Sequence, residues 1–325
     1  MIQKAIIRIK DRIESILMMN TYESNLRSFF RNQSYDPGQE FYPPNPKLKQ
    51  RVSETFMQRG HSPEELKPML PCIAFGCDTA HFLYQKSPFD IQVYVGVYTA
   101  LFFYFEDTQS SNVERLQHFA KVFGQGSSHG DPHYDHFASL LIHDTPQLFG
   151  PYATACIINS SLDMIASCGL EYQFPKGFSR MTNDFPSWLR SRTGNGESYA
   201  WFNFPKSVFS EDTQLGEYVT SIKGIAEWID LVNDVLSYHK EMRLGNESNN
   251  LLANQARARK STPLAQLRLS CKRIEVLKRE TEWVLQPCPD AVQAVENFRE
   301  GYIMFHCAQP RYDLAGLGIG VRCRG

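Results

Sequence analysis

Three oxygen-bearing side chains, Asn233, Ser237 and Glu241, recur every four residues within the segment Leu231–Glu241. In a helix, steps of about 100° per residue would place them at roughly 0°, 40° and 80°, on one face. Amide, hydroxyl and carboxylate oxygens are the ligands that a hard cation such as Mg²⁺ prefers. Because helical side chains lean toward the N-terminus, Glu241 should reach back toward Ser237. The stripe indicates a cation site, although a solvated polar face would explain this segment equally well.

The same stripe contains residue types that a helix interior disfavours. Asn and Ser compete for backbone hydrogen bonds, so two of them on one face in the middle of a helix favour a functional explanation. Asp234 directly follows Asn233 and lies about 100° away around the helix. We therefore expect Asp234 to be structural or solvent-exposed, and not a member of the stripe.

A second acidic cluster, Glu106-Asp107, ends the apolar segment Val93–Phe105. Acidic side chains are unfavourable at a helix C-terminus, where the helix dipole is negative, and a bound cation would offset that cost. Phe102 and Phe103 lie one turn before Glu106, so carboxylates above aromatic rings would form a pocket with a metal-binding mouth and an apolar floor. A helix that simply ends at the surface is the alternative.

The segment that leads to this cluster is ambiguous in its secondary structure. Val93–Phe105 is rich in β-branched and aromatic residues, and a buried parallel strand with acids at its carboxyl end would look similar. Asp90–Asp107 contains Gly96 as its one breaker. Strands usually stop near about 10 residues, so the length favours a helix.

The elements that must position these groups are predicted to be helices. Residues 1–20 carry apolar residues at helical spacing and predict an amphipathic helix, followed by turn-rich connectors at Asp36–Pro46 and Gly60–Pro71. Long apolar-periodic segments with short breaks follow from Ala80 onward. The longest stretch predicted to be irregular is Gly124–His136. The pattern indicates an all-α fold in one domain.

Composition excludes several other classes of function. The 325 residues carry a formal net charge of −1, so no basic excess supports nucleic-acid binding. The eight cysteines contain no CxxC pair, which argues against a structural zinc site. The N-terminal residues interrupt their apolar positions with charges, unlike a signal peptide, and the twelve apolar residues Tyr94–Phe105 are too few to span a bilayer, which takes about 20 residues. We expect a cytoplasmic protein without membrane insertion.

Two further segments accompany the acidic motifs. Phe185–Arg190 precedes the stripe and ends in an arginine. Near the C-terminus, Gly301–Ile303 is followed by His306 and then by the pair Arg311-Tyr312. Both segments contain an arginine, and arginine suits bidentate hydrogen bonding to phosphate oxygens.

In this order, the four motifs resemble the trichodiene-synthase-like class I sesquiterpene cyclases of fungi, over roughly residues 70–315. The stripe matches the second metal-binding motif of that family completely, including its Lys-Glu ending at Lys240-Glu241. The first motif departs from the family, because it begins with Glu106 where the family usually has Asp and it lacks a third acid. Glu is one methylene longer than Asp and can still ligate Mg²⁺.

The resemblance implies a single-domain helical bundle around a central apolar cavity, with residues 1–70 as N-terminal helix and connector and residues 70–315 as the catalytic core. It also implies a Mg²⁺-dependent cyclase of secondary metabolism that ionises farnesyl diphosphate, cyclises the allylic cation and releases diphosphate. A cluster of three Mg²⁺ ions is part of this expectation. The family often dimerises, which leaves a homodimer open.

The resemblance also assigns roles to individual residues. The expected catalytic and metal-binding oxygens are those of Glu106, Asp107, Asn233, Ser237 and Glu241. The diphosphate is expected to bind Arg190, Lys240, Arg311 and Tyr312. Aromatic faces stabilise a desolvated cation by about 1–2 kcal/mol each, and the candidates for this pocket lining are Phe102, Phe103, Trp201, Trp228, Tyr302 and Phe305.

Three alternatives stay open at this stage. The first is a catalytically impaired helical binding protein of the same fold, which the altered first motif favours and the intact stripe opposes. The second is a prenyl chain-elongating synthase, which would normally carry two aspartate-rich motifs. The third is a metallohydrolase built on side chains of the irregular stretch, namely His129, Asp131, His133, Asp135 and His136, which lie in a predicted solvated loop.

Overall fold

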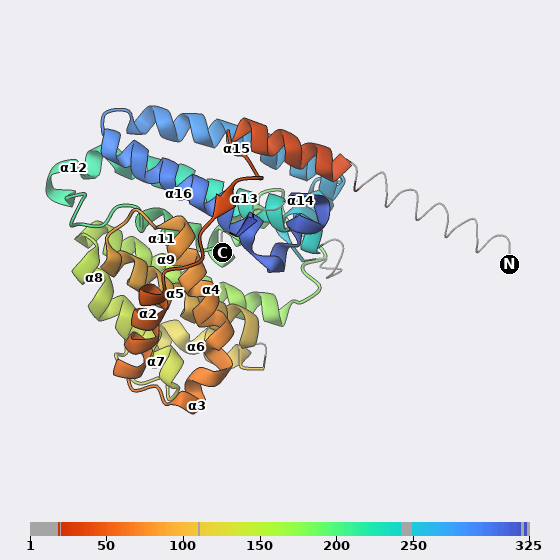
Figure 1. Ribbon diagram of the computed structural model, residues 1–325. Coiled ribbons are helices and arrows are strands. Elements are labelled where there is room, and N and C mark those ends of the chain that lie inside the picture. Colours follow the sequence, from red (N-terminus) through yellow and green to blue (C-terminus); the bar gives the residue numbers. More distant parts are fainter. Residues whose placement is uncertain (1–18, 20, 110, 242–248, 320–321, 324–325) are drawn as a thin grey trace.

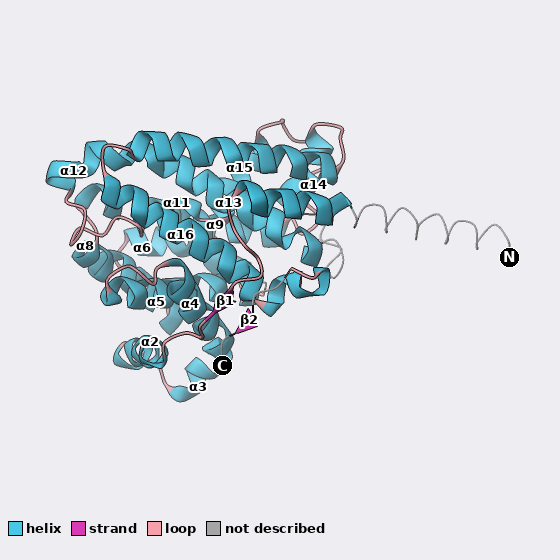
Figure 2. Ribbon diagram, turned by 45° about the horizontal axis from the view of Figure 1, so that its top comes forward, coloured by secondary structure: helices cyan, strands magenta, loops and turns pink. Residues whose placement is uncertain are grey.

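The computed structural model describes residues 19, 21–109, 111–241, 249–319 and 322–323, and nearly all of its regular structure is helical (Figures 1 and 2). Most of the helix predicted over residues 1–20 lies outside the described residues, and residues 21–32 are helical. The remaining α-helices run over Pro46–Gln58 (α2), Pro63–Leu66 (α3), Leu70–Leu83 (α4), Phe89–Thr108 (α5), Val113–Gly124 (α6), Pro132–Ser139 (α7), Thr145–Leu148 (α8), Pro151–Gln173 (α9), Phe185–Thr193 (α10), Gly196–Trp201 (α11), Glu211–Tyr218 (α12), Ile222–Lys240 (α13), Leu251–Ala258 (α14), Pro263–Leu285 (α15) and Pro289–Ala308 (α16).

Short elements connect and close the bundle. One π-helical turn covers Leu140–Asp144 (η2), and 3₁₀ turns cover Lys67–Met69 (η1), Val219–Ser221 (η3), Pro310–Tyr312 (η5) and Leu314–Leu317 (η6). Two short strands, Glu40–Phe41 (β1) and Arg322–Cys323 (β2), pair in parallel and join the N-terminal connector to the end of the chain. The prediction of an all-α fold is confirmed.

The closest helix pair, α4 and α5, forms the centre of the bundle (Figure 1). The predicted helix over Asp90–Asp107 is confirmed as α5, and Gly96 does not break it. A methyl group on Gly76 would lie 2.3 Å from the carbonyl oxygen of Gly96, so the missing side chain of Gly76 allows the backbones of α4 and α5 to approach each other. A methyl group on Gly96 would instead lie 2.8 Å from Val52 on α2. Aromatic and branched residues suit this helix because it is buried around most of its circumference.

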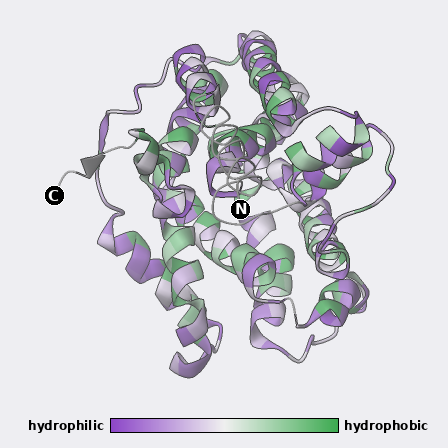
Figure 3. Ribbon diagram, turned by 90° about the vertical axis from the view of Figure 1, so that its right-hand side faces the viewer, coloured by the Kyte–Doolittle hydropathy of each residue, from purple (hydrophilic) through white to green (hydrophobic). Residues whose placement is uncertain are grey.

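A second group of long helices covers the other side of the centre, where α13 packs against α11, α15 and α16 (Figure 1). The helical segment 21–32 joins this group, since the Tyr22 hydroxyl donates a hydrogen bond to the Val235 carbonyl at 3.0 Å. Most helices carry hydrophilic and hydrophobic residues along their length (Figure 3), as expected for helices with one face in the core. The apolar face of α13 includes Trp228, Val232 and Val235, which are fully buried.

The stretch Gly124–His136 is less irregular than predicted, because α7 begins within it at Pro132. Asp131 is the N-cap of α7 and its side chain accepts a hydrogen bond from the backbone N–H of His133 at 3.0 Å. Proline at the first helical position favours the start of a helix. The Asp-Pro pair was therefore a start signal within a segment whose Gly and Ser content suggested a loop.

Helix α9 is the one described helix that is long and apolar enough to cross a membrane by length and composition. Half of its most apolar window is buried inside the fold, and α9 packs against α6, α10 and α11. The core helix of a globular bundle accounts for its composition.

Replacing Gly76 by Ala should destabilise the protein by about 2–3 kcal/mol, because the new methyl group would overlap the backbone of α5 and force α4 and α5 apart. Gly216 on α12 provides a matched control, since a methyl group there meets nothing within 4 Å. Gly216→Ala should leave stability unchanged or raise it by up to about 1 kcal/mol. Urea denaturation of both variants measures the difference, and equal stabilities would contradict this packing.

Candidate active site

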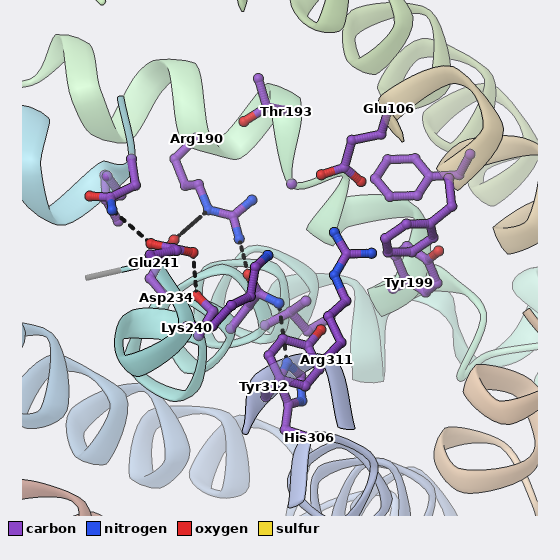
Figure 4. A pocket seen from close by; sticks show the side chains of 18 of the residues that line it. Glu106, Arg190, Thr193, Tyr199, Asp234, Lys240, Glu241, His306, Arg311 and Tyr312 are labelled. Carbon is purple, nitrogen blue, oxygen red and sulfur yellow. Dashed lines mark hydrogen bonds and ion pairs between the residues drawn. The ribbon is translucent and has the colours of Figure 1, made fainter. Parts of the chain in front are cut away.

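A cavity of about 370 Å³ lies where the ends of several helices meet. Its walls come from α4, α5, α9, α10, α11, α13, α14, α16 and η5, which come from distant parts of the sequence. Both acidic motifs face this cavity. Figure 4 shows Glu106 and Glu241 on different sides of the pocket, with Arg190 and Arg311 between them in this view.

The wall formed by α13 presents the predicted stripe. Asn233, Ser237 and Glu241 all line the cavity. Glu241 is the C-cap residue of α13 and reaches back, as predicted, so that the Ser237 hydroxyl donates a hydrogen bond to its Oε1 at 2.6 Å. Asn250 donates from its Nδ2 to Oε2 of the same carboxylate at 2.7 Å. Neutral donors thus orient Glu241, and the side chain stays buried.

The opposite wall is formed by the last turns of α5, where Glu106 and Asp107 line the cavity. Among the described residues, no side chain donates a hydrogen bond to the Glu106 carboxylate. Burial, with a smaller effect of the nearby Asp107 charge, raises the pKa of Glu106, although Arg311, Arg190 and Lys240 act against this shift. The folded protein therefore disfavours the negative charge that it places here.

Arg190 on α10 is held by three acceptors on α13. Its Nε is 3.0 Å from Oδ2 of Asp234 and its Nη2 is 3.0 Å from Oδ1 of Asn233, while Asp230 lies 3.8 Å from Nη1. Burial alone would lower the pKa of Arg190, but the carboxylates of Asp234 and Asp230 outweigh it and raise that pKa. The guanidinium is a fixed positive charge at the edge of the cavity.

Asp234 and Asp230 correct the prediction from helical spacing alone. Asp234 was expected to be structural or solvent-exposed. It is structural, because it is buried and binds Arg190, and it also lines the cavity. Asp230, which the sequence analysis did not single out, is also buried, and its Oδ1 lacks a hydrogen bond among the described residues. Burial raises the pKa of Asp230 to about 7, against the effect of Arg190.

The remaining predicted cations lie at the same cavity. Arg311, on η5, contacts Asp107 with both terminal nitrogens, at 3.2 and 3.4 Å, and its guanidinium lies over the ring of Phe103 at 5.1 Å. Tyr312 and Lys240 also line the cavity. All four residues predicted to bind diphosphate, Arg190, Lys240, Arg311 and Tyr312, are therefore brought together.

Aromatic side chains from α5 and α16 also line the cavity. Of the six predicted aromatic residues, Phe102, Phe103, Tyr302 and Phe305 line the cavity. The prediction is wrong for Trp201 and Trp228, which are buried in the core away from it. Trp228 lies five residues before Asn233, about 140° around α13. Its indole packs against Tyr302 and Phe298.

Trp201 lies two residues after Tyr199 on α11, a rotation of about 200° that places the two side chains on nearly opposite faces of the helix. Tyr199 lines the cavity, and Trp201 packs against Tyr152 and Tyr218 instead. Tyr199 was not predicted to line the cavity, because the spacing alone does not show which of Tyr199 and Trp201 faces it. Its hydroxyl bonds to that of Thr99 at 2.9 Å, so the ring is held in place.

Other lining residues also escaped the sequence analysis. None of them was named as a candidate site residue, and they are Phe75, Thr79, Leu83, Glu171, Leu189, Thr193, Ile229, Leu251 and Asn254. Asn250 had a usable signal, since an Asn directly before an apolar run is typical of an N-cap, and it caps α14 by accepting a hydrogen bond from the Ala253 N–H. Its second role, the hydrogen bond to Glu241, depends on how the chain folds back.

The donor atoms at the cavity fit a hard divalent cation. Carboxylate, amide and hydroxyl oxygens face it from two walls, with no thiolate or imidazole ligand needed. Among the described residues there is no cluster of three or more His, Cys, Asp or Glu side chains that could hold a metal by themselves. Mg²⁺ usually binds one or two carboxylates together with substrate phosphates and does not require such a cage. The best evidence for a cation site is that no described side chain donates a hydrogen bond to the Glu106 carboxylate.

The histidine-rich segment does not form a competing metal centre. Asp131 forms an ion pair with Arg115 and, as the N-cap of α7, accepts a hydrogen bond from the N–H of His133. Asp135 accepts hydrogen bonds from the Ser128 hydroxyl and from the N–H of His129. Within the described chain, the acidic side chains that the metallohydrolase alternative needs are thus used in local structure.

Comparison with known proteins agrees with this geometry. A sequence model of the family described as Trichodiene synthase (TRI5) matches residues 61–318. The chain is 28% identical over 278 residues to the (E)-beta farnesene synthase of Metarhizium brunneum, covering 85% of this chain and 83% of that protein. It is 27% identical over 230 residues to the alpha-cuprenene synthase COP6 of Coprinopsis cinerea, covering 70% and 69% of the two chains.

The fold is also similar to that of solved terpene synthases. The linalool/nerolidol synthase of Streptomyces clavuligerus superimposes with a TM-score of 0.61 at 11% sequence identity, over 82% of this chain and 97% of that chain. An identity this low compares the fold alone. The family match, in contrast, spans most of the sequence and includes both acidic motifs. The chain therefore belongs to the trichodiene synthase family of class I terpene synthases, which are lyases.

Proposed function

We propose that this protein is a Mg²⁺-dependent sesquiterpene cyclase that ionises farnesyl diphosphate and cyclises the resulting allylic cation. The observation that carries the proposal is the convergence of oxygen ligands from α5 and α13, with the cations Arg190, Lys240 and Arg311, on one cavity that aromatic and aliphatic side chains also line. This arrangement suits a substrate with a polyanionic head and an apolar tail.

The chain length of the substrate is supported by the relatives. Farnesene and cuprenene, which give two of them their names, are fifteen-carbon hydrocarbons. A Streptomyces clavuligerus relative in fold was solved in complex with 2-fluorogeranyl diphosphate, which has a ten-carbon chain. Farnesyl diphosphate is our proposal, and geranyl diphosphate is the comparison that any assay should include.

Glu106, Asp107, Asn233, Ser237 and Glu241 would hold the metal ions. Bound Mg²⁺ supplies charge that stabilises the departing diphosphate, and the family resemblance implies three such ions. The protein's own cations would bind the diphosphate oxygens, with Arg190 and Arg311 suited to bidentate contacts. Each arginine already contacts acidic side chains, so the diphosphate would share or replace these contacts.

The inner wall would shield and stabilise the cation once diphosphate has left. Phe102, Tyr199, Tyr302 and Phe305 line the cavity with aromatic rings, and Leu83 and Ile229 add aliphatic surface, as catalysis through a carbocation requires. The hydroxyl groups of Tyr199 and Tyr302 are hydrogen-bonded to Thr99 and to the Ile229 carbonyl. Both hydroxyls are thereby occupied within the protein.

Product analysis tests the proposal directly. Purified protein is incubated with farnesyl or geranyl diphosphate and Mg²⁺, with EDTA in parallel, and released diphosphate and volatile products are measured by gas chromatography with mass spectrometry. We expect a fifteen-carbon cyclic hydrocarbon from farnesyl diphosphate and none with EDTA. Folded protein that releases neither product nor diphosphate would favour the alternative, a binding protein that retains this fold.

Glu241→Gln should lower kcat/KM for farnesyl diphosphate by about 100-fold or more and raise the Mg²⁺ concentration needed for half-maximal rate, because an anionic ligand is lost. Gln has the same shape as Glu, and its oxygen can accept from Asn250 while its N–H donates to the Ser237 hydroxyl, so stability should change little. Glu227→Gln makes the same substitution on the same helix at a position that pairs with Arg273 on the surface. Activity that falls equally in both variants would show that the loss is not specific to the cavity.

Glu106→Gln should abolish turnover yet raise the free energy of unfolding in metal-free buffer at pH 7. Burial and Asp107 raise the pKa of Glu106 in the folded state, so the ionised carboxylate costs stability above that pKa. The stabilisation by Gln should shrink as the pH falls below the ordinary Glu value, where both folded and unfolded wild type carry a neutral carboxyl group. Urea denaturation at pH 7 and pH 4 measures it. A Gln variant less stable than wild type at pH 7 would refute this reading of the site.

A further inference from the structure

His306 on α16 lines the cavity next to Asn233 and contacts its amide. Its Nε2 lies 3.1 Å from Nδ2 of Asn233, and its Nδ1 lies 2.8 Å from the carbonyl oxygen of Tyr302. The imidazole is almost fully buried and packs against the rings of Tyr302 and Tyr312 (Figure 4). Its position is therefore fixed by neighbours on both faces.

The hydrogen-bond partners determine where the imidazole proton lies. A backbone carbonyl can only accept, so Nδ1 of His306 carries the proton. The neutral ring then offers Nε2 as an acceptor and nothing else. The Asn233 group that faces it must be the amide nitrogen.

A second contact confirms the orientation of the same amide independently. The Arg190 guanidinium can only donate, and its Nη2 is 3.0 Å from Oδ1 of Asn233. Both partners thus agree that the oxygen faces Arg190 and the nitrogen faces His306.

We propose that His306 is a positioning residue that holds the Asn233 amide with Oδ1 available to the cation and Nδ2 turned away from it. The inference rests on the proposed function. When Arg190 turns to the diphosphate, His306 remains as the partner that distinguishes the two ends of the amide. An amide turned around would present N–H groups to the cation, which cannot ligate it.

Two substitutions separate this role from packing. In His306→Gln the side-chain oxygen can replace Nε2 as the acceptor for Asn233, whereas the shorter side chain of His306→Asn keeps a donor for the Tyr302 carbonyl and does not reach Asn233. The probe is Mn²⁺ with inorganic pyrophosphate, measured by the loss of the free Mn²⁺ signal in electron paramagnetic resonance. We expect His306→Asn to weaken Mn²⁺ binding by about 10- to 100-fold and His306→Gln by less than about 3-fold. Equal losses in both variants, or no loss in either, would overturn the inference.

The Asn233→Asp background provides the decisive control. A carboxylate presents an oxygen in either orientation, so His306→Asn should then weaken Mn²⁺ binding by less than about 3-fold. A full loss in this background would contradict the role of His306 as well. Wild-type protein that binds no Mn²⁺ with pyrophosphate would instead refute the proposed function, and the inference with it.

A measurement on the wild-type protein needs neither a variant nor a metal. Nitrogen-15 NMR of protein with labelled histidine reports which ring nitrogen of His306 carries the proton. We expect protonated Nδ1 and bare Nε2 at pH 7.5. A proton on Nε2 would overturn the inference, because Asn233 would then have to present its oxygen to His306.

Discussion

Negative charge at the edge of an apolar cavity is costly, and the arrangement of this site follows from how that cost is met. Five carboxylates, those of Glu106, Asp107, Glu171, Asp234 and Glu241, line the cavity. Arg190 compensates Asp234 and Arg311 compensates Asp107, whereas Glu241 accepts hydrogen bonds from the neutral donors Ser237 and Asn250, and Glu106 has a raised pKa. Among the described residues, no arginine or lysine forms an ion pair with Glu106, which is where the proposed function would place a metal ion.

On the cavity-facing sides of α5 and α13, an apolar residue lies one helical turn before an oxygen-bearing residue. On α13, Ile229 lies one turn before Asn233, and on α5, Phe102 lies one turn before Glu106. Each wall therefore changes from apolar to oxygen-rich toward the same end of the cavity. The tight packing of α4 on α5 at Gly76 fixes one of these walls relative to the rest of the bundle.

Local spacing was enough to predict the helices and the common face of the stripe, and the family resemblance predicted that the motifs converge. Neither predicted the three-dimensional partners of individual side chains. Asn233, Ser237 and Glu241 follow a helical period, and their common face was predictable from it. The same period places Trp228 about 140° from Asn233 and would have excluded it from the cavity, whereas Trp201 shares no helix with a predicted motif residue. The contact of Asp234 with Arg190 spans 44 residues of sequence, and that of His306 with Asn233 spans 73 residues. Neither has a local signal, because both depend on how α10 and α16 pack on α13.

A crystal structure with Mn²⁺ and inorganic pyrophosphate, analysed by anomalous scattering, tests the central claim most directly. The account predicts Mn²⁺ peaks in this cavity, ligated by Glu106 on one side and by oxygens of Asn233, Ser237 and Glu241 on the other, with pyrophosphate between them and Arg190 and Arg311. Peaks at other sites, or an ordered pyrophosphate bound without metal ions between these two walls, would contradict it.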